Sequence, residues 1–291
     1  MRSGKTPRIL IFDYDDYRAY LLAFYKKMKM ENKSGFSYSI FAKNTGFRSA
    51  SFLKLVIDGK RNLSISSIQN LSKALGHNQK ESKYFEGLVL FNQATDTSEK
   101  ILRLKVLLGR RSTLKSNTHY LSHAQFNYYS RWYYIAIREL IALPDFKEDS
   151  RWISERLISD ISPAEVSGAI SELIQLGLVF REDSGRLKQK EAFVRGEAGQ
   201  MRSAIARYLQ KQMIEKGSES LDRVAPEKRE ISSLTLGVSR AGFSAIKKEI
   251  LLCKEKILEI CADDSNALDE IIQVNLHLFP LTDKKRNRGD K

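Results

Sequence analysis

The chain has 291 residues, enough for two or three domains, and its 42% hydrophobic content is normal for a folded protein, which excludes a disordered or fibrous class. Its 49 lysines and arginines outnumber 35 acidic residues, and the resulting net charge of +14 indicates an anionic partner such as nucleic acid. No apolar run approaches the roughly 18 residues of a membrane-spanning helix, so we expect no membrane segment. Cys253 and Cys261 are eight residues apart in one expected helix, too far to bond each other, which fits a reduced, cytoplasmic setting.

The positive charge is densest near the amino terminus. Residues 1–95 contain 16 Lys and Arg against 7 Asp and Glu, a net charge of +9, and the rest of the chain supplies +5. Residues 1–12 are predicted to be a loose basic arm. A first helix is expected over 14–30, because acidic residues precede it and lysines end it, as the helix dipole favours.

The segment 37–76 is the most informative part of the sequence. Ala42, on a short helix, allows a second helix to approach closely, and Gly46 accepts the positive φ that ends a helix. The second helix is expected to start near Ser49, which can cap it. We expect its core side to carry Phe52, Leu55 and Val56, and its outer side to carry Ser49, Ala50, Leu53 and Lys54.

Small and cationic side chains on such an outer side could enter a DNA major groove. The turn Asp58–Asn62 adds two cations where phosphates would flank the helix. We therefore predict groove contacts by Arg48, Ser49, Ser51 and Lys54, and phosphate contacts by Lys60 and Arg61.

A closing helix is expected to end at Gly76, and another over 79–93 completes a five-helix bundle. The composition turns polar at 94–98, so we place a DNA-binding domain at 1–95 and a linker helix and hinge at 96–118.

A second domain is expected over 119–283. It opens with closely spaced aromatic residues between Phe126 and Tyr134, whose helical spacing favours core or interface over base stacking. Ser162 to Glu165 is a capping box that opens a helix ending at Gly177, and residues 178–190 alternate like a hairpin with a tight turn. Three helices followed by a hairpin is the order of a winged helix.

We expect this winged-helix-like unit to have a structural, dimerising or signal-receiving role. Its third helix carries Glu165 and Glu172 and no Lys or Arg, and carboxylates that face phosphates would be repelled. DNA binding by the unit stays open as an alternative because the hairpin carries Arg181, Arg186, Lys188 and Lys190. After a helix over 199–216, the pattern predicts a strand (231–239), a long helix (241–261) and a strand (270–279), a β-α-β element, and then a basic tail at 284–291.

The sequence contains no recognisable catalytic motif: neither a P-loop, nor GxGxxG, nor GxSxG is present. Among the four histidines, His119 and His123 have helical spacing, but no cysteine or HExxH pattern accompanies them. We therefore expect no enzyme activity, no cofactor and no bound metal.

Five features of the central segment are Phe41-Ala42, Gly46, Ser51, Gly59 to Asn62, and Leu71 to Leu75, and through them it resembles the lambda-repressor-like helix-turn-helix. Further residues carry a second resemblance: Phe36 to Tyr38, Gly59 to Ser64, Tyr84-Phe85, Leu88-Val89, Phe91 to Ala94, Tyr128 to Ser130, Trp132-Tyr133, Leu176 to Leu178, Ser232 to Thr235, and Leu278 to Leu281. Through these the chain is similar, over nearly its whole length, to the Fibrobacter-type paralogous helix-turn-helix family. That resemblance implies a transcriptional regulator with a carboxy-terminal region of unsettled function.

These patterns predict a mainly α-helical protein with a small α+β part: an amino-terminal helix-turn-helix bundle, a central winged-helix-like unit and a carboxy-terminal β-α-β element. We expect a cytoplasmic, sequence-specific regulator of transcription that binds double-stranded DNA as a homodimer and uses its carboxy-terminal region for dimerisation or signal reception. One alternative is a protein-interaction module, since Leu53 and Ile57 place two aliphatic side chains on the outer side of the expected reading helix. Another is an effector-binding sensor formed by the region from residue 120, with a small molecule still to be identified.

Overall fold

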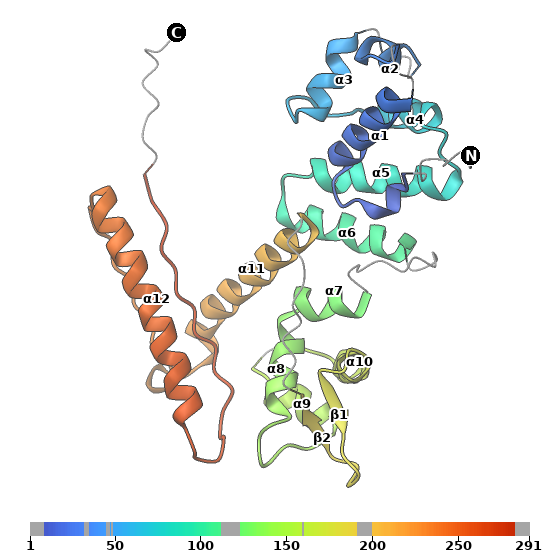
Figure 1. The fold of residues 1–291 in the computed structure, drawn as a ribbon. Coiled ribbons are helices and arrows are strands. Elements are labelled where there is room, and N and C mark those ends of the chain that lie inside the picture. Colours follow the sequence, from blue (N-terminus) through green and yellow to red (C-terminus); the bar gives the residue numbers. More distant parts are fainter. Residues whose placement is uncertain are drawn as a thin grey trace, which may run out of the picture.

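The computed structural model describes residues 9–31, 35–44, 47, 49–111, 123–158, 160–190 and 200–282. This part of the chain is mainly helical and contains one small antiparallel sheet (Figure 1). The α-helices are α1 Tyr17–Glu31, α2 Tyr38–Asn44, α3 Ala50–Ile57, α4 Ile65–Ala74, α5 Gln79–Gln93, α6 Thr97–Arg111, α7 His123–Ser130, α8 Trp132–Leu140, α9 Ser150–Arg156, α10 Pro163–Gln175, α11 Gln200–Arg223 and α12 Arg240–Asp263. The strands are β1 Val179–Arg181 and β2 Leu187–Gln189, and the 3-10 helices are η1 Ile11–Asp13 and η2 Pro226–Lys228.

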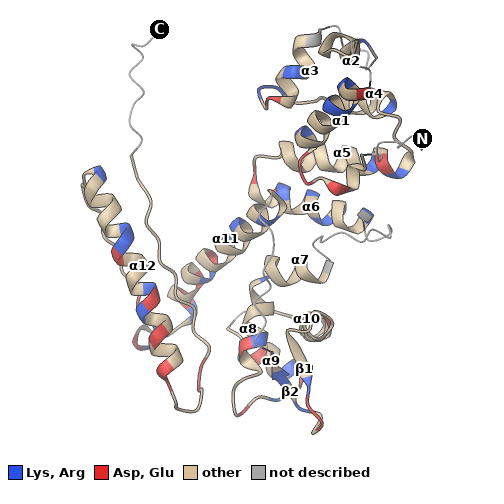
Figure 2. Ribbon diagram, viewed as in Figure 1, with Lys and Arg blue, Asp and Glu red and all other residues tan. Residues whose placement is uncertain are grey.

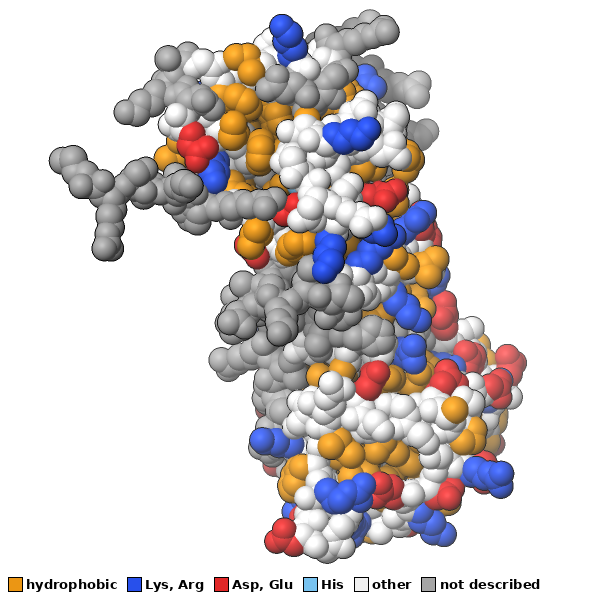
Figure 3. Space-filling view, turned by 90° about the vertical axis from the view of Figure 1, so that its right-hand side faces the viewer, with side chains coloured by type: hydrophobic (Ala, Val, Ile, Leu, Met, Phe, Trp, Pro, Cys, Tyr) orange, Lys and Arg blue, Asp and Glu red, His pale blue; other side chains and the backbone are white. Residues whose placement is uncertain are grey.

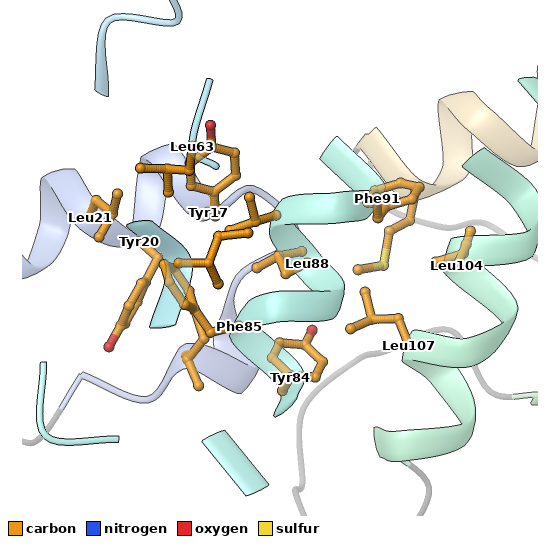
Figure 4. Close-up of a cluster of buried hydrophobic side chains, with 14 of the residues drawn as sticks. Tyr17, Tyr20, Leu21, Leu63, Tyr84, Phe85, Leu88, Phe91, Leu104 and Leu107 are labelled. Atoms are coloured by element: carbon orange, nitrogen blue, oxygen red, sulfur yellow. The ribbon is translucent and has the colours of Figure 1, made fainter. Parts of the chain in front are cut away.

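A first hydrophobic cluster joins α1 to α6. Figure 4 shows its centre, where Tyr17 of α1, Phe85 and Phe91 of α5, and Leu104 and Leu107 of α6 lie together. Helices α5 and α6 come so close at Gly87 that a Cβ there would lie 3.1 Å from Leu107 Cδ1. The helix expected to be a linker within 96–118 is therefore part of the amino-terminal core, which continues past residue 95.

The amino-terminal arm is shorter than expected. Residues 1–8 lie outside the described part, but Ile11 is buried and belongs to the first cluster. Ile11 is part of the 3-10 helix η1, and α1 begins after it at Tyr17 rather than at the predicted residue 14. Helix α5 has the predicted bounds because the Asn78 side chain caps it and Glu81 completes a capping box.

A second hydrophobic cluster joins α8, α9, α10 and the hairpin. The predicted capping box at Ser162 is present and α10 begins directly after it. The predicted hairpin is also present, with Val179 opposite Gln189 and Arg181 opposite Leu187 in antiparallel register. Both features have short-range sequence signatures, which explains why they could be located in advance.

The carboxy-terminal part departs from expectation. Helix α11 continues to Arg223, well beyond the predicted end at 216, whereas α12 closely matches its predicted range. Segments 231–239 and 270–279, both predicted to be strands, form no strand here, since the sheet found in the described residues consists of β1 and β2. A strand needs a hydrogen-bonded neighbour, and neither segment has one among the residues that the structure describes.

Candidate nucleic-acid interface

Helix α2 is attached to α1 by aromatic side chains. Tyr25 and Tyr38 stack with ring centroids 4.0 Å apart and an interplanar angle of 10°, and Phe24 stacks on Phe41 at 5.7 Å. Ala42 is buried, as the close approach of α3 to α2 requires. The α1–α2 pair thus forms the support on which α3 is placed.

The exposed side of α3 differs in part from the prediction. Leu53 and Val56 are both fully buried, so Leu53 belongs to the core rather than to the outer side. Ser51 and Lys54 are exposed, and their i, i+3 spacing places them on one side of the helix. Ser49 occupies the N-cap position, but its hydroxyl lies 2.5 Å from the Ser51 hydroxyl and makes no capping bond to the backbone.

The end of α3 is a tight turn that presents two cations. Gly59 has φ +76°, a conformation that glycine adopts without strain. The amides of Lys60 and Arg61 both donate to the Leu55 carbonyl, at 2.8 and 3.1 Å. Both side chains are exposed, immediately beyond the carboxy-terminal end of α3.

Arg18 of α1 holds this turn. Its Nε donates to the Val56 carbonyl at 3.0 Å and its Nη2 donates to Asn62 Oδ1 at 2.8 Å. Its guanidinium also lies 4.5 Å from the centre of the Tyr17 ring. Sequence reasoning missed this residue, because the contacted groups lie 38 and 44 positions away.

Gln93 of α5 fixes the loop between α3 and α4. Its Oε1 accepts from the Leu63 amide at 2.7 Å, and its Nε2 donates to the Leu63 carbonyl at 3.0 Å. The Tyr17 hydroxyl donates to the same Oε1 at 3.0 Å. Burial raises the pKa of Tyr17 to about 12, so the hydroxyl stays protonated and keeps donating at neutral pH.

Three of the six predicted DNA-contacting residues are cations that make no ion pair within the described part of the chain: Lys54, Lys60 and Arg61. Figure 2 shows the basic residues at α3 and the turn after it. Ser49 and Ser51 lie exposed at the start of the same helix. Arg48 lies outside the described residues. The structure therefore brings a small hydroxyl-bearing surface together with cations on and beyond α3.

Of the two carboxylates of α10, Glu165 is exposed as expected, whereas Glu172 is half-buried and bonded within the protein. Both Glu172 oxygens accept from Asn127 Nδ2, at 3.0 and 2.9 Å, and the Tyr134 hydroxyl donates to Glu172 Oε2 at 2.9 Å. Glu165 closes the capping box with Ser162. The expected repulsion of phosphate by Glu172 is thus wrong, because that side chain is turned toward the interior of the unit.

Two of the four cations of the hairpin, Arg181 and Lys188, are paired with neighbouring carboxylates. Arg181 forms two hydrogen bonds with Glu148, at 2.8 and 2.7 Å, which lower the pKa of that carboxyl group. Lys188 pairs with Glu182 at 3.0 Å. On the face drawn in Figure 3, charges of both signs are interspersed over the lower part of the molecule. Arg186 and Lys190 of the hairpin form no ion pair within the described residues, as is also the case for Lys60 and Arg61 at the turn after α3.

No group of three or more His, Cys, Asp or Glu is placed to hold a metal within the residues described, which include neither His119 nor the side chain of His123. Across these ranges, no helix combines the length and apolar character needed to cross a bilayer.

Comparison with known proteins places the chain in a family. A family model described as a domain of unknown function (DUF4423) matches residues 113–281, which begin after the interface around α3. Neither the curated proteins nor the solved structures contain a match. Because the matched region covers more than half of the sequence, the chain belongs to the family of this domain of unknown function, DUF4423.

Proposed function

We propose that the protein is a sequence-specific DNA-binding regulator of transcription that acts in the cytoplasm. The observation that carries the proposal is the exposed side of α3, with Ser51 and Lys54, bounded by the unpaired cations Lys60 and Arg61. In this proposal α2 and α3 are a helix-turn-helix and α3 is the helix that enters the major groove.

The dimensions of α3 suit this role. Eight residues give a helix about 12 Å long, comparable to the width of the major groove. Serine hydroxyls near its start can bond base edges, and Lys54 can reach a base or a phosphate. Lys60 and Arg61 would then meet the phosphates that flank the groove.

The charge of residues 1–95 supports an anionic partner. Residues 1–95 carry +9 of the net +14, although they make up only about a third of the chain. Non-specific attraction to phosphate scales with such a charge, and base contacts add sequence preference. We place α8 to α10 and the hairpin in a winged-helix-like unit with a structural or signal-receiving role, because α10 carries two glutamates and no cation and two of the four hairpin cations are paired with carboxylates.

The proposal is tested by selecting bound sequences from genomic fragments with the full chain and then measuring affinity for the selected site at several salt concentrations. Lys60→Ala is expected to weaken binding to all sequences alike and to lower the salt slope by roughly one unit, as expected for one lost phosphate contact. Loss of a base contact from Lys54 should cost about 1 to 3 kcal/mol and relax the preference at one position.

Lys105→Ala is a matched control, because Lys105 is an exposed lysine on α6, away from α3. It should leave both affinity and salt slope nearly unchanged. The assignment would be wrong if the double variant Lys54→Ala, Arg61→Ala bound the selected site with unchanged affinity and unchanged salt dependence.

A further inference from the structure

Residues 230–282, here called the arm, expose far more apolar surface than the rest of the chain. Helix α12 is 24 residues long and contains no buried residue. Figure 1 shows α12 and the segment that follows it standing apart from α1 to α10. The large hydrophobic side chains that the arm exposes are Ile231, Leu234, Leu236, Val238, Leu251, Leu252, Leu258, Ile260, Leu268, Ile271, Ile272, Val274, Leu276, Leu278, Phe279 and Leu281.

Helix α12 carries apolar residues on more than one side, which is typical of a helix that is covered on more than one side. Phe243, Ile250 and Ile257 follow one side and are half-buried. Leu251 and Leu258 follow a second side and are 53% and 59% exposed. A helix that is apolar on several sides is typical of a core rather than of a surface.

The segments on either side of α12 alternate like strands that cover a core. Leu234, Leu236 and Val238 share one side of an extended chain, as do Leu276 and Leu278. Neither segment is hydrogen-bonded into a strand within the described residues. Their backbone groups are therefore available for pairing with another chain.

The exposed area has the magnitude of a stable interface. At about 60 to 120 Å² for each aliphatic side chain, the exposed fractions add up to an apolar area on the order of 1,000 Å². This area is summed over several sides of the arm, and each partner of a standard complex buries about 800 Å².

The base of the arm is attached to α11 and its surroundings. Lys228 pairs with Glu270 at 2.8 Å, and Asn275 Nδ2 donates to the Met213 carbonyl at 2.7 Å. Arg229 Nη1 donates to the Ser220 carbonyl at 3.1 Å. The arm thus leaves the rest of the molecule at a defined position, with its apolar sides still uncovered.

The charge of the arm restricts what can cover it. Residues 230–282 contain 5 Lys and Arg against 8 Asp and Glu, a net charge of −3 in a chain of +14. Nucleic acid and acidic membranes would be repelled rather than attracted. The exposed aliphatic side chains of the arm favour an occupant that presents apolar protein surface.

We propose that the occupant is the arm of a second copy of this chain, so that two arms pack against each other about a twofold axis. A second arm supplies the same helix and the same two strand-like segments, so helix can pack on helix and each segment can pair with a segment of the other copy. Such an isologous contact closes on itself and leaves no further apolar surface to recruit more copies. The inference does not depend on DNA binding, although a dimer would present two copies of α3.

The test is sedimentation of the full chain over a wide range of concentrations, and a dimer is expected. Leu236→Glu with Leu258→Glu should raise the dimer dissociation constant at least about tenfold, because buried carboxylates would face apolar partners. Both side chains are exposed in the single chain, so circular dichroism should show an unchanged helix content. Leu102→Glu is the matched control, since Leu102 is 62% exposed on α6 and lies outside the arm.

A second measurement uses the free, exposed thiols of Cys253 and Cys261 on α12. A short bis-maleimide should yield covalent dimers of the full chain, and the yield should fall in the double glutamate variant. A monomer at every concentration would overturn the proposal. So would a dimer whose dissociation constant and cross-linking are the same with and without the arm substitutions, because the contact would then lie elsewhere.

Discussion

Replacement of Arg18 by alanine is expected to lower the free energy of unfolding by about 2 to 3 kcal/mol. Two hydrogen bonds from a charged donor would be lost, at 3.0 Å to the Val56 carbonyl and 2.8 Å to Asn62 Oδ1. Each such bond contributes about 1.5 to 3 kcal/mol when protected, and the partial exposure of Arg18 reduces their sum. The guanidinium also lies at the carboxy-terminal end of α3, where the helix dipole favours a cation by about 0.3 to 1 kcal/mol.

Urea denaturation followed by circular dichroism measures this loss, and a fall in Tm of about 3 to 5 °C should accompany it. A double-mutant cycle with Asn62→Ala should give a coupling energy of about 1 kcal/mol. Arg103→Ala is the control, because its i, i+4 pair with Glu99 is a surface ion pair worth about 0.5 kcal/mol or less. If Arg18→Ala cost no more than Arg103→Ala, the conclusion that Arg18 holds the turn after α3 would be refuted.

Three further changes test other parts of the fold. Above pH 10 Tyr17 ionises in the unfolded chain but not in the folded chain, where its pKa is about 12, so the free energy of unfolding should fall between pH 10 and 12. Urea titrations of Tyr17→Phe should show a shallower fall with pH. Equal falls with pH in the wild type and the variant would contradict this. Glu172→Ala removes the acceptor of Asn127 Nδ2 and of the Tyr134 hydroxyl, and should lower the free energy of unfolding by about 2 to 4 kcal/mol in chemical denaturation. A loss below about 1 kcal/mol would show that these hydrogen bonds to Glu172 are dispensable. Gly59→Ala should destabilise the fold by about 1 to 2 kcal/mol because φ at this glycine is +76°. Gly109→Ala within α6 should instead stabilise it by about 0.5 to 1 kcal/mol. Changes in Tm of the same sign for both variants, measured by calorimetry, would be inconsistent with a strained turn.

Elements with local sequence signatures could be predicted from the sequence. The capping box at Ser162, the glycine at the end of α10 and the hairpin turn each depend on residues a few positions apart. The exposure of Lys54, Lys60 and Arg61 also followed from charge and turn chemistry. Local propensity and tertiary structure agree at these places, so the prediction and the structure coincide.

Features that depend on distant parts of the chain could not be predicted. The predicted orientation of α3 was wrong at Leu53 because five of the last six residues of the helix are apolar, interrupted only by Lys54, so the helix has no clear polar side. The amphipathic pattern of α6 showed that it would pack, but not that it packs on α5. The hydrogen bonds of Gln93 to Leu63 span 30 positions, which no window of sequence contains.

Helix α11 belongs to both halves of the molecule. Its first turns, with Met201, Ala204 and Ile205, complete the first hydrophobic cluster. The helix, about 36 Å long in all, then carries the chain past α7 and α8, where Gln212 Nε2 donates to the Ser130 carbonyl at 2.6 Å. Part of the amino-terminal core is thus supplied from within the DUF4423 region. We therefore expect the two halves to melt in one calorimetric transition, and a fragment that stops before α11 to lose cooperativity rather than to behave as an independent unit.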